Sequence, residues 1–312
     1  MRPSGLLVAA GTALVSLSLI GYLDRFYWAA ELAAHFRVQY ALGLLFIGLA
    51  LMLARRRRPA AVFTVVSVTQ LASIVPLYLP HPADVPEDAP RFRIYMHNVH
   101  ASNPAKQEVL QAIRAANPDV IVLLEVNDDW MRALKPLLEG AYEFSVTQPR
   151  SDDFGLALLS RLPLERSETL FLGEAGVPSI RVRARLGERS VTILASHTVP
   201  PMGAARAALR DGQLAAIAAT ASTISGPLVV VGDLNCTHFS ARFRDLLRVG
   251  GLEDSARGRG FQPTWPAPWL PVMLPLDHCL LRGGLAVRRR RTRAACGSDH
   301  LSLVVDLVLL DE

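Results

Sequence analysis

The segment LVVVGDLN, residues 228–235, ends a run of aliphatic residues with an acid and an amide two positions apart. In an extended chain, residues i and i+2 point to the same face, so Asp233 and Asn235 would project together from the end of a buried strand. A carboxylate beside an amide can orient an attacking water and hydrogen-bond a phosphoryl oxygen. The same residues also suit an ordinary turn. The choice depends on whether other polar strand ends converge on this one.

Other aliphatic runs end or begin at polar residues in the same way. These residues are Asn98, Glu125, His197, Asp277, Asp299 and His300. An acid that follows VIVLL, as Glu125 does, is costly to bury unless it is paired or bound to a metal. Carboxylate, amide and imidazole groups gathered around one cation are the set that Mg²⁺-assisted phosphoester hydrolysis requires.

From about Arg91 to Leu310 the chain resembles the endonuclease/exonuclease/phosphatase superfamily. The matching segments, in order, are the strand end at Asn98, LLEV, GLALLSR at 155–161, SHTVPP, GDLN, LDH and SDH. The superfamily includes DNase I-like nucleases, AP endonucleases, neutral sphingomyelinases and inositol-polyphosphate 5-phosphatases. The resemblance implies a four-layer α/β/β/α sandwich of the α+β class, with the site at one edge of the paired sheets.

The resemblance also implies a role for each residue. A cation, Mg²⁺ with Mn²⁺ as a substitute, would be held by Asn98, Glu125 and Asp299. The catalytic set would be His197, Asp233, Asn235, Asp277 and His300, in which Asp277 fixes the imidazole of His300. Asn235, His197 and Arg210 would contact the substrate.

The substrate stays open at this stage. AP endonucleases carry a tyrosine where this chain has His197, which argues against repair of abasic DNA. Nucleic acid, a phospholipid and a small phosphoester all remain candidates. The alternative from another class is a catalytically inactive domain of the superfamily that serves as a membrane-bound binding module. The sequence points to no protein partner.

Short strands and helices after Pro90 would position these residues. The expected strands are Arg93–Val99, Asp119–Val126, Leu156–Ser160, Ser179–Leu186, Ser190–Ser196, Leu228–Gly232, Leu276–Leu281 and Leu301–Leu309, and the expected helices are Pro104–Ala116, Asp129–Leu138, Ala204–Ser222 and Ala241–Val249. The basic run at 288–293 reads as a solvated edge strand or as a patch for anionic lipid. Trp265 and Trp269 lie in a proline-rich loop, near the site or at a membrane interface.

Residues 1–80 are predicted to anchor the chain in a bilayer. Three uncharged stretches, Pro3–Leu23, Val38–Ala54 and Pro59–Pro80, are long enough to be transmembrane helices. Four arginines at 55–58 place the loop between the last two stretches in the cytoplasm. The proline-rich linker 81–90 and the catalytic domain 91–312 would then lie outside the cytoplasm, on the inner membrane of the cell. A cleaved signal peptide in place of the first helix would leave this side unchanged.

Charge and cysteine content argue against a non-specific nucleic-acid binder and against a disulfide-rich or zinc-binding protein. The first 80 residues hold seven arginines and two acids, so the net charge of +5 belongs to them and the remainder is neutral. A domain without net positive charge is poorly suited to bind nucleic acid non-specifically. The three cysteines, Cys236, Cys279 and Cys296, have the spacing of neither a disulfide framework nor a zinc site.

Overall fold

The computed structural model describes residues 3–79, 86 and 89–310. They form two compact units. The first unit is Met1–Pro80 together with Cys236–Arg244 and Arg257–Gly260, and the second is His81–Asn235, Asp245–Ala256 and Phe261–Glu312. The N-terminal unit thus includes two short segments from beyond the predicted border at residue 80. Most of the predicted linker 81–90 lies outside the described residues.

The second unit is built on two mixed sheets of six strands each. The order in the first sheet is β11 (Leu285–Thr292), β12 (Leu303–Leu309), β1 (Arg91–Asn98), β2 (Val120–Leu124), β4 (Leu156–Ser160) and β3 (Phe144–Gln148). The order in the second is β5 (Leu164–Phe171), β6 (Pro178–Leu186), β7 (Arg189–Ser196), β8 (Leu228–Asp233), β10 (Asp277–Arg282) and β9 (Glu253–Asp254).

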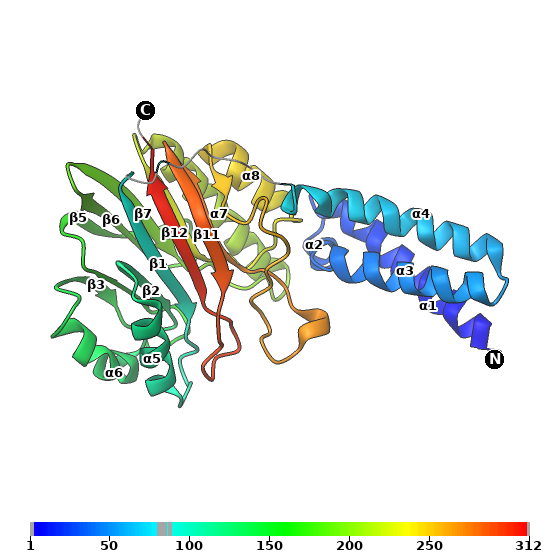
Figure 1. Cartoon of the computed structure of the whole chain (residues 1–312), viewed down its shortest axis with the longest axis horizontal. Helices are drawn as coiled ribbons and strands as arrows, with labels where there is room; N and C mark the ends of the chain where they lie inside the picture. Colours follow the sequence, from blue (N-terminus) through cyan, green and yellow to red (C-terminus); the bar gives the residue numbers. More distant parts are fainter. Residues whose placement is uncertain (1–2, 80–85, 87–88, 311–312) are drawn as a thin grey trace. The chain divides into compact units, whose positions relative to one another are not determined.

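The two sheets pack face to face through alternate residues of their strands. Ile94 and Val122 of the first sheet share one buried apolar cluster with Ile193 and Val231 of the second. Helices α5 (Lys106–Ala116) and α6 (Asp128–Leu138) cover the outer face of the first sheet, and α7 (Ala204–Thr223) and α8 (Ala241–Gly250) lie on the other side (Figure 1). The four-layer sandwich expected from the sequence is therefore confirmed.

Local sequence signals set the helix ends beside the strand ends. Asn127 caps α6, because its side-chain oxygen accepts a hydrogen bond of 3.0 Å from the backbone N–H of Trp130. Asn117 ends α5 in the left-handed conformation, with φ of 46°. The cap at Asn127 begins a helix only two residues after Glu125, so the chain turns sharply where β2 ends.

Three strands were not expected from the sequence. β3 is an edge strand whose residues are only partly buried, and β5 carries charged side chains on its solvent face. β9 has only two residues. Each lacks the aliphatic run that predicts a buried strand.

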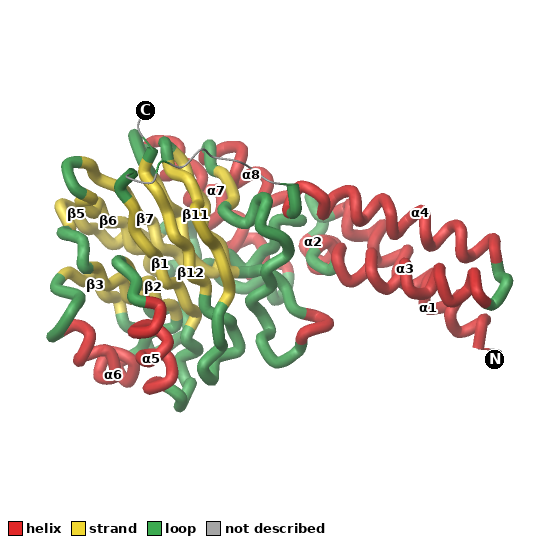
Figure 2. The backbone as a smooth tube through the Cα atoms, in the orientation of Figure 1, coloured by secondary structure: helices red, strands yellow, loops and turns green. Residues whose placement is uncertain are grey.

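The first unit contains the N-terminal helices, which run along one another (Figure 2). They are α1 (Pro3–Ile20), η1 (Gly21–Leu23), α2 (Trp28–Ala34), α3 (Arg37–Leu53), α4 (Arg57–Ile74) and η2 (Val75–Leu77). Two stretches, Pro3–Leu23 and Arg57–Leu77, are long and apolar enough to cross a bilayer. α2 and α3, bent by 56° at their junction, would supply a third span if the pair counts as one.

Packing in this unit leaves many apolar side chains outside. Leu44, Leu51 and Phe63 are buried between α3 and α4, whereas Phe46 is 71% and Leu53 is 78% exposed. Surfaces of this kind suit contact with lipid tails, because water would be a poor solvent for them.

Candidate active site

Strand register brings the polar strand ends together. β8 and β10 pair antiparallel with Asp233 opposite Asp277. β1 and β2 pair parallel with Asn98 opposite Leu124, so Glu125 is the next residue on the neighbouring strand. Central strands of both sheets therefore deliver side chains to the same edge of the sandwich.

Gly232 allows β7 and β8 to approach closely. A Cβ atom at this position would lie 1.8 Å from the backbone oxygen of Ser196, so no other residue fits without a backbone shift. The close approach continues past the strand ends, where the N–H of Thr198 donates to the carbonyl of Asp233 at 3.0 Å. As a result, Nε2 of His197 lies 3.6 Å from Oδ2 of Asp233.

Asn98 connects the two sheets. Its amide nitrogen donates to Oε1 of Glu125 at 2.8 Å and to Oδ2 of Asp233 at 3.3 Å. Glu125 has the left-handed conformation, with φ of 62°, which is unusual for a residue other than glycine. Its other carboxylate oxygen accepts from the N–H of Ala101 at 3.2 Å. Glu125 is thus held in one orientation with its carboxylate facing Asn98.

His300 and Asp277 form a buried pair. Nδ1 of His300 lies 2.8 Å from Oδ2 of Asp277, and its Nε2 lies 3.6 Å from Oδ2 of Asp233. One ligand atom of each of these three residues lies within 4.8 Å of the others. The site therefore places two carboxylates and one imidazole side by side away from water.

Burial and mutual charge shift the protonation equilibria of this trio. Burial, followed by the charge of Asp277, raises the pKa of Asp233 to about 7. Burial alone would lower the pKa of His300, but the charge and hydrogen bond of Asp277 outweigh it and raise that pKa to about 10. Burial likewise opposes ionisation of Asp277, yet His300 outweighs it and lowers the pKa of Asp277. At neutral pH, His300 and Asp277 form an ion pair and Asp233 is near its midpoint.

His197 and Glu125 shift in the directions that favour their neutral forms. Burial, and then the nearby charge of His300, lowers the pKa of His197 to about 4. The ring of Phe154 packs against that imidazole at 5.1 Å between centroids. Burial raises the pKa of Glu125, against the opposing hydrogen bonds from Asn98 and Ala101. A bound cation would offset the burial of the Glu125 carboxylate.

His100 lies between Glu125 and Asp299, and Trp265 contacts Asp299. Nδ1 of His100 is 3.5 Å from a carboxylate oxygen of Glu125 and 3.8 Å from one of Asp299. The indole N–H of Trp265 donates to the other oxygen of Asp299 at 2.9 Å. From the sequence alone, His100 is a neighbour of Asn98 that suits either a supporting contact in the site or a solvated position, and its left-handed φ of 58° has no simple sequence signal.

Arg210 has a different place from the one expected. It is fully buried in the described structure, and its guanidinium donates to the backbone carbonyl of Asn235 at 2.9 Å and to Asp211 at 2.8 Å. Arg210 therefore supports the loop after β8 rather than presenting its charge to a substrate. Asn235 is held by its own amide, which donates to the carbonyl of Thr198 at 2.8 Å.

The donor set fits a hard divalent cation. Glu125 and Asp299 offer carboxylate oxygens, which Mg²⁺ and Mn²⁺ prefer. Asn98 turns its NH2 group towards Glu125, and its oxygen accepts from the N–H of His100 at 3.2 Å, so Asn98 orients the ligand Glu125 in this structure. Asp233, Asp277 and His300 form a second candidate set, in which one ligand atom of each residue lies within 4.8 Å of the others. Because Mg²⁺ prefers oxygen ligands, the carboxylates of Glu125 and Asp299 are better candidate ligands than a set that includes an imidazole.

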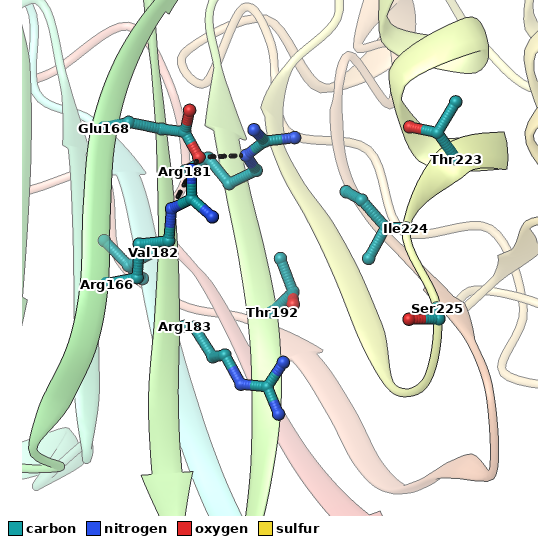
Figure 3. Close-up of a pocket in the computed structure, with 9 residues that line it drawn as sticks. All are labelled: Arg166, Glu168, Arg181, Val182, Arg183, Thr192, Thr223, Ile224 and Ser225. Carbon is teal, nitrogen blue, oxygen red and sulfur yellow. Dashed lines mark hydrogen bonds and ion pairs between the residues drawn. The ribbon is translucent and has the colours of Figure 1, made fainter.

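A pocket of about 220 Å³ lies elsewhere on the sandwich and is lined by paired charges (Figure 3). It lies over β5, β6 and β7 beside the end of α7. Its arginines are paired with carboxylates, since Arg181 lies 2.6 Å from Glu168 and Arg183 lies 3.0 Å from Glu165. Paired charges on a sheet surface are ordinary structural features, so this pocket is not a second catalytic candidate.

Comparison with known proteins agrees with the fold. The model of the Endonuclease/Exonuclease/phosphatase family matches residues 94–300. No curated protein matches the sequence.

Solved structures share the same sandwich. The human Nocturnin catalytic domain with bound sulfate is 23% identical, with a TM-score of 0.59 over 72% of this chain and 96% of that one. D. rerio TDP2 complexed with single strand DNA product is 15% identical, with a TM-score of 0.60 over 70% and 98%. Sphingomyelinase C from Streptomyces griseocarneus is 19% identical, with a TM-score of 0.53 over 70% and 99%. At these identities the likeness concerns the fold alone.

Proposed function

Because the chain belongs to the endonuclease/exonuclease/phosphatase family, we propose that it hydrolyses phosphodiester or phosphomonoester bonds with the help of Mg²⁺ or Mn²⁺. One observation carries the proposal. The amide of Asn98 reaches Glu125 at 2.8 Å and Asp233 at 3.3 Å, which joins the candidate metal ligands of one sheet to the candidate base of the other. A structural strand end would not need to bury a second and third acid beside the first.

In this proposal each side chain acts through the geometry described above. A cation held by the carboxylates of Glu125 and Asp299, with Asn98 orienting Glu125, would neutralise charge on the phosphoryl oxygens. Asp233 takes a proton from the attacking water, because a carboxylate with a pKa near 7 is partly ionised and still basic at neutral pH.

The imidazoles contribute charge and hydrogen bonds. His300, kept protonated by Asp277, stabilises the negative charge that develops on the phosphoryl group. His197 and Asn235 also lie against Asp233 and are suited to hold the scissile group, His197 at the leaving oxygen and Asn235 at a phosphoryl oxygen. The neutral His197 can donate a hydrogen bond without adding charge to the site.

Anchorage in the membrane, with the catalytic part outside the cytoplasm, is the second half of the proposal. It is supported by contacts inside the N-terminal unit. Nδ1 of His35 lies 3.0 Å from the hydroxyl of Thr237, and Asp24 accepts from the N–H of Ala241 at 2.8 Å. The segment 236–244 therefore lies at the N-terminal end of α3.

The arginine turn lies at the other end of the same helix. α3 has 17 residues, so residues 55–58 are about 25 Å along its axis from residue 37. If the four arginines stay in the cytoplasm, segment 236–244 lies on the opposite side of the bilayer. Asn235, which precedes that segment, is then extracytoplasmic.

The test uses the full chain in detergent and bis-p-nitrophenyl phosphate, with Mg²⁺ or EDTA. Glu125→Gln and His300→Ala are expected to lower kcat/KM by at least about 100-fold, because each removes a charge from the reacting centre. Glu139→Gln, an exposed carboxylate at the end of α6, is the matched control and is expected to leave the rate unchanged. Activity that persists in Glu125→Gln would contradict the proposal.

The same assay addresses the non-enzymatic alternative. A wild-type protein that hydrolyses no phosphoester in Mg²⁺ or Mn²⁺, yet binds inorganic phosphate or a phosphodiester, would be a binding module. If the wild type is active, a side-by-side comparison of DNA, small phosphoesters and labelled lipids identifies the preferred substrate.

A further inference from the structure

Exposed apolar side chains of the second unit gather in two loops. Among its described residues, six large hydrophobic side chains are exposed: Phe171, Met202, Val249, Trp269, Leu270 and Val272. Four of these six lie in the segment after His197 or in the segment before Asp277. Trp269 is 67%, Leu270 80% and Met202 76% exposed. Scattered apolar residues need no explanation, but a group of this exposure beside one site does.

The longer loop is fixed to the candidate site at its base. Trp265 and Leu274 pair across it, and the indole N–H of Trp265 donates to Asp299 at 2.9 Å. The N–H of Ala267 donates to the backbone carbonyl of Asp299 at 2.8 Å. The tip of the loop is ordered, because it forms the short helix η3 (Leu270–Val272). Trp269 and Leu270 are therefore held beside the catalytic residues and exposed to the surroundings.

The two loops contain no charged residue, although Arg206 on α7 lies beside one of them and donates to the carbonyl of Pro200 at 3.3 Å. Phe261 to Leu276 contains no lysine, arginine, aspartate or glutamate, and neither does Thr198 to Ala205. A nucleic-acid substrate continues past the scissile phosphate, and its further phosphates require cations on the surface that meets them. A surface made of apolar loop residues fits an alkyl chain instead, and Arg206 beside it suits the phosphate of the same substrate.

We propose that Met202, Trp269, Leu270 and Val272 form an apolar rim that receives the hydrocarbon part of the substrate, and that this substrate is a lipid phosphoester. The inference rests on the proposed hydrolysis at the same site. The N-terminal helices favour a lipid as the source of the alkyl chain, because spans of bilayer length would keep the chain among lipids. The rim selects the substrate and takes no part in the bond cleavage.

A homologous series of alkyl p-nitrophenyl phosphates tests the rim without knowledge of the headgroup. In each hydrolysis, water attacks phosphorus, the bond to p-nitrophenolate breaks, and alkyl phosphate remains. For the wild-type full chain in dodecyl maltoside, kcat/KM is expected to be at least about tenfold higher for the octyl than for the methyl ester, since a few buried methylenes suffice for that ratio.

Variants of the rim separate binding of the alkyl chain from cleavage of the phosphoester bond. Trp269→Ser/Leu270→Ser is expected to bring the octyl-to-methyl ratio close to one while the methyl rate stays unchanged. Met202→Ser, in the other loop, is expected to lower the ratio independently. Phe171→Ser is the matched control, because this side chain is 60% exposed on β5 and belongs to neither loop, and any uptake of the octyl ester by detergent would affect it equally.

Three results would overturn the inference, and they are distinguishable. Equal kcat/KM values for the methyl and octyl esters in the wild type would contradict the proposed role of the rim and leave the proposed hydrolysis intact. Loss of single-stranded DNA hydrolysis in the Trp269 variant, with an unchanged alkyl ratio, would make the loop a surface for stacking bases. If no ester is hydrolysed with Mg²⁺ or Mn²⁺, the proposed function itself is contradicted.

Discussion

Replacing Asp277 by asparagine removes the counter-charge of His300 and leaves the shape of the site almost unchanged. The two side chains are buried and 2.8 Å apart, and the pair raises the pKa of His300 from 6.5 to about 10. The folded pKa lies above the unfolded value, so the stabilisation is complete below pH 6.5 and is lost as the pH rises through about 10. At about 1.4 kcal/mol per pKa unit, the pair contributes about 4 to 5 kcal/mol near pH 6. Loss of one partner of a buried ion pair has a similar cost.

The assay is denaturant unfolding of wild type and Asp277→Asn at two pH values. The difference in unfolding free energy should be about 4 to 5 kcal/mol near pH 6 and fall to about 1 kcal/mol near pH 9.5, where wild-type His300 begins to lose its proton. Asp129→Asn, an exposed acid on α6, should change stability by less than about 0.5 kcal/mol at both pH values. A difference for Asp277→Asn that does not vary with pH would refute the reasoning, because it would come from packing rather than charge.

Three further variants test other features of the structure. Gly232→Ala would place a Cβ atom 1.8 Å from the carbonyl oxygen of Ser196, so we expect a loss of about 2 to 4 kcal/mol in thermal unfolding together with loss of activity; an unchanged Tm would contradict the close approach. Burial lowers the pKa of His97 to about 4, below its unfolded 6.5, so the protein should lose stability as the pH falls between these values, and His97→Gln should reduce that slope in urea titrations. Asp24→Ala removes the acceptor of the Ala241 N–H at the start of α8 and should lower stability in detergent by about 1 to 2 kcal/mol, with no effect expected only if water replaces the carboxylate.

Aliphatic runs were the most informative feature of the sequence for the fold. VIVLL and LVVVGD became the central strands β2 and β8, because a run of β-branched and aliphatic residues can be buried on both faces of a strand. The edge strands β3 and β5 escaped prediction, since one face of each meets solvent and its residues mix polar or charged groups with apolar ones. Burial is a property of position in the sheet, which short edge sequences do not encode strongly.

The sequence by itself determined which residue types stand at the strand ends, where the charge of +5 lies and which segments are apolar enough for a bilayer. Only the tertiary structure decided which of these groups meet. His100 reaches both Glu125 and Asp299, whereas Arg210 turns inward to the carbonyl of Asn235. The physical reason is that a side chain's direction follows from backbone conformation and strand register, and these are set by contacts between residues far apart in the chain.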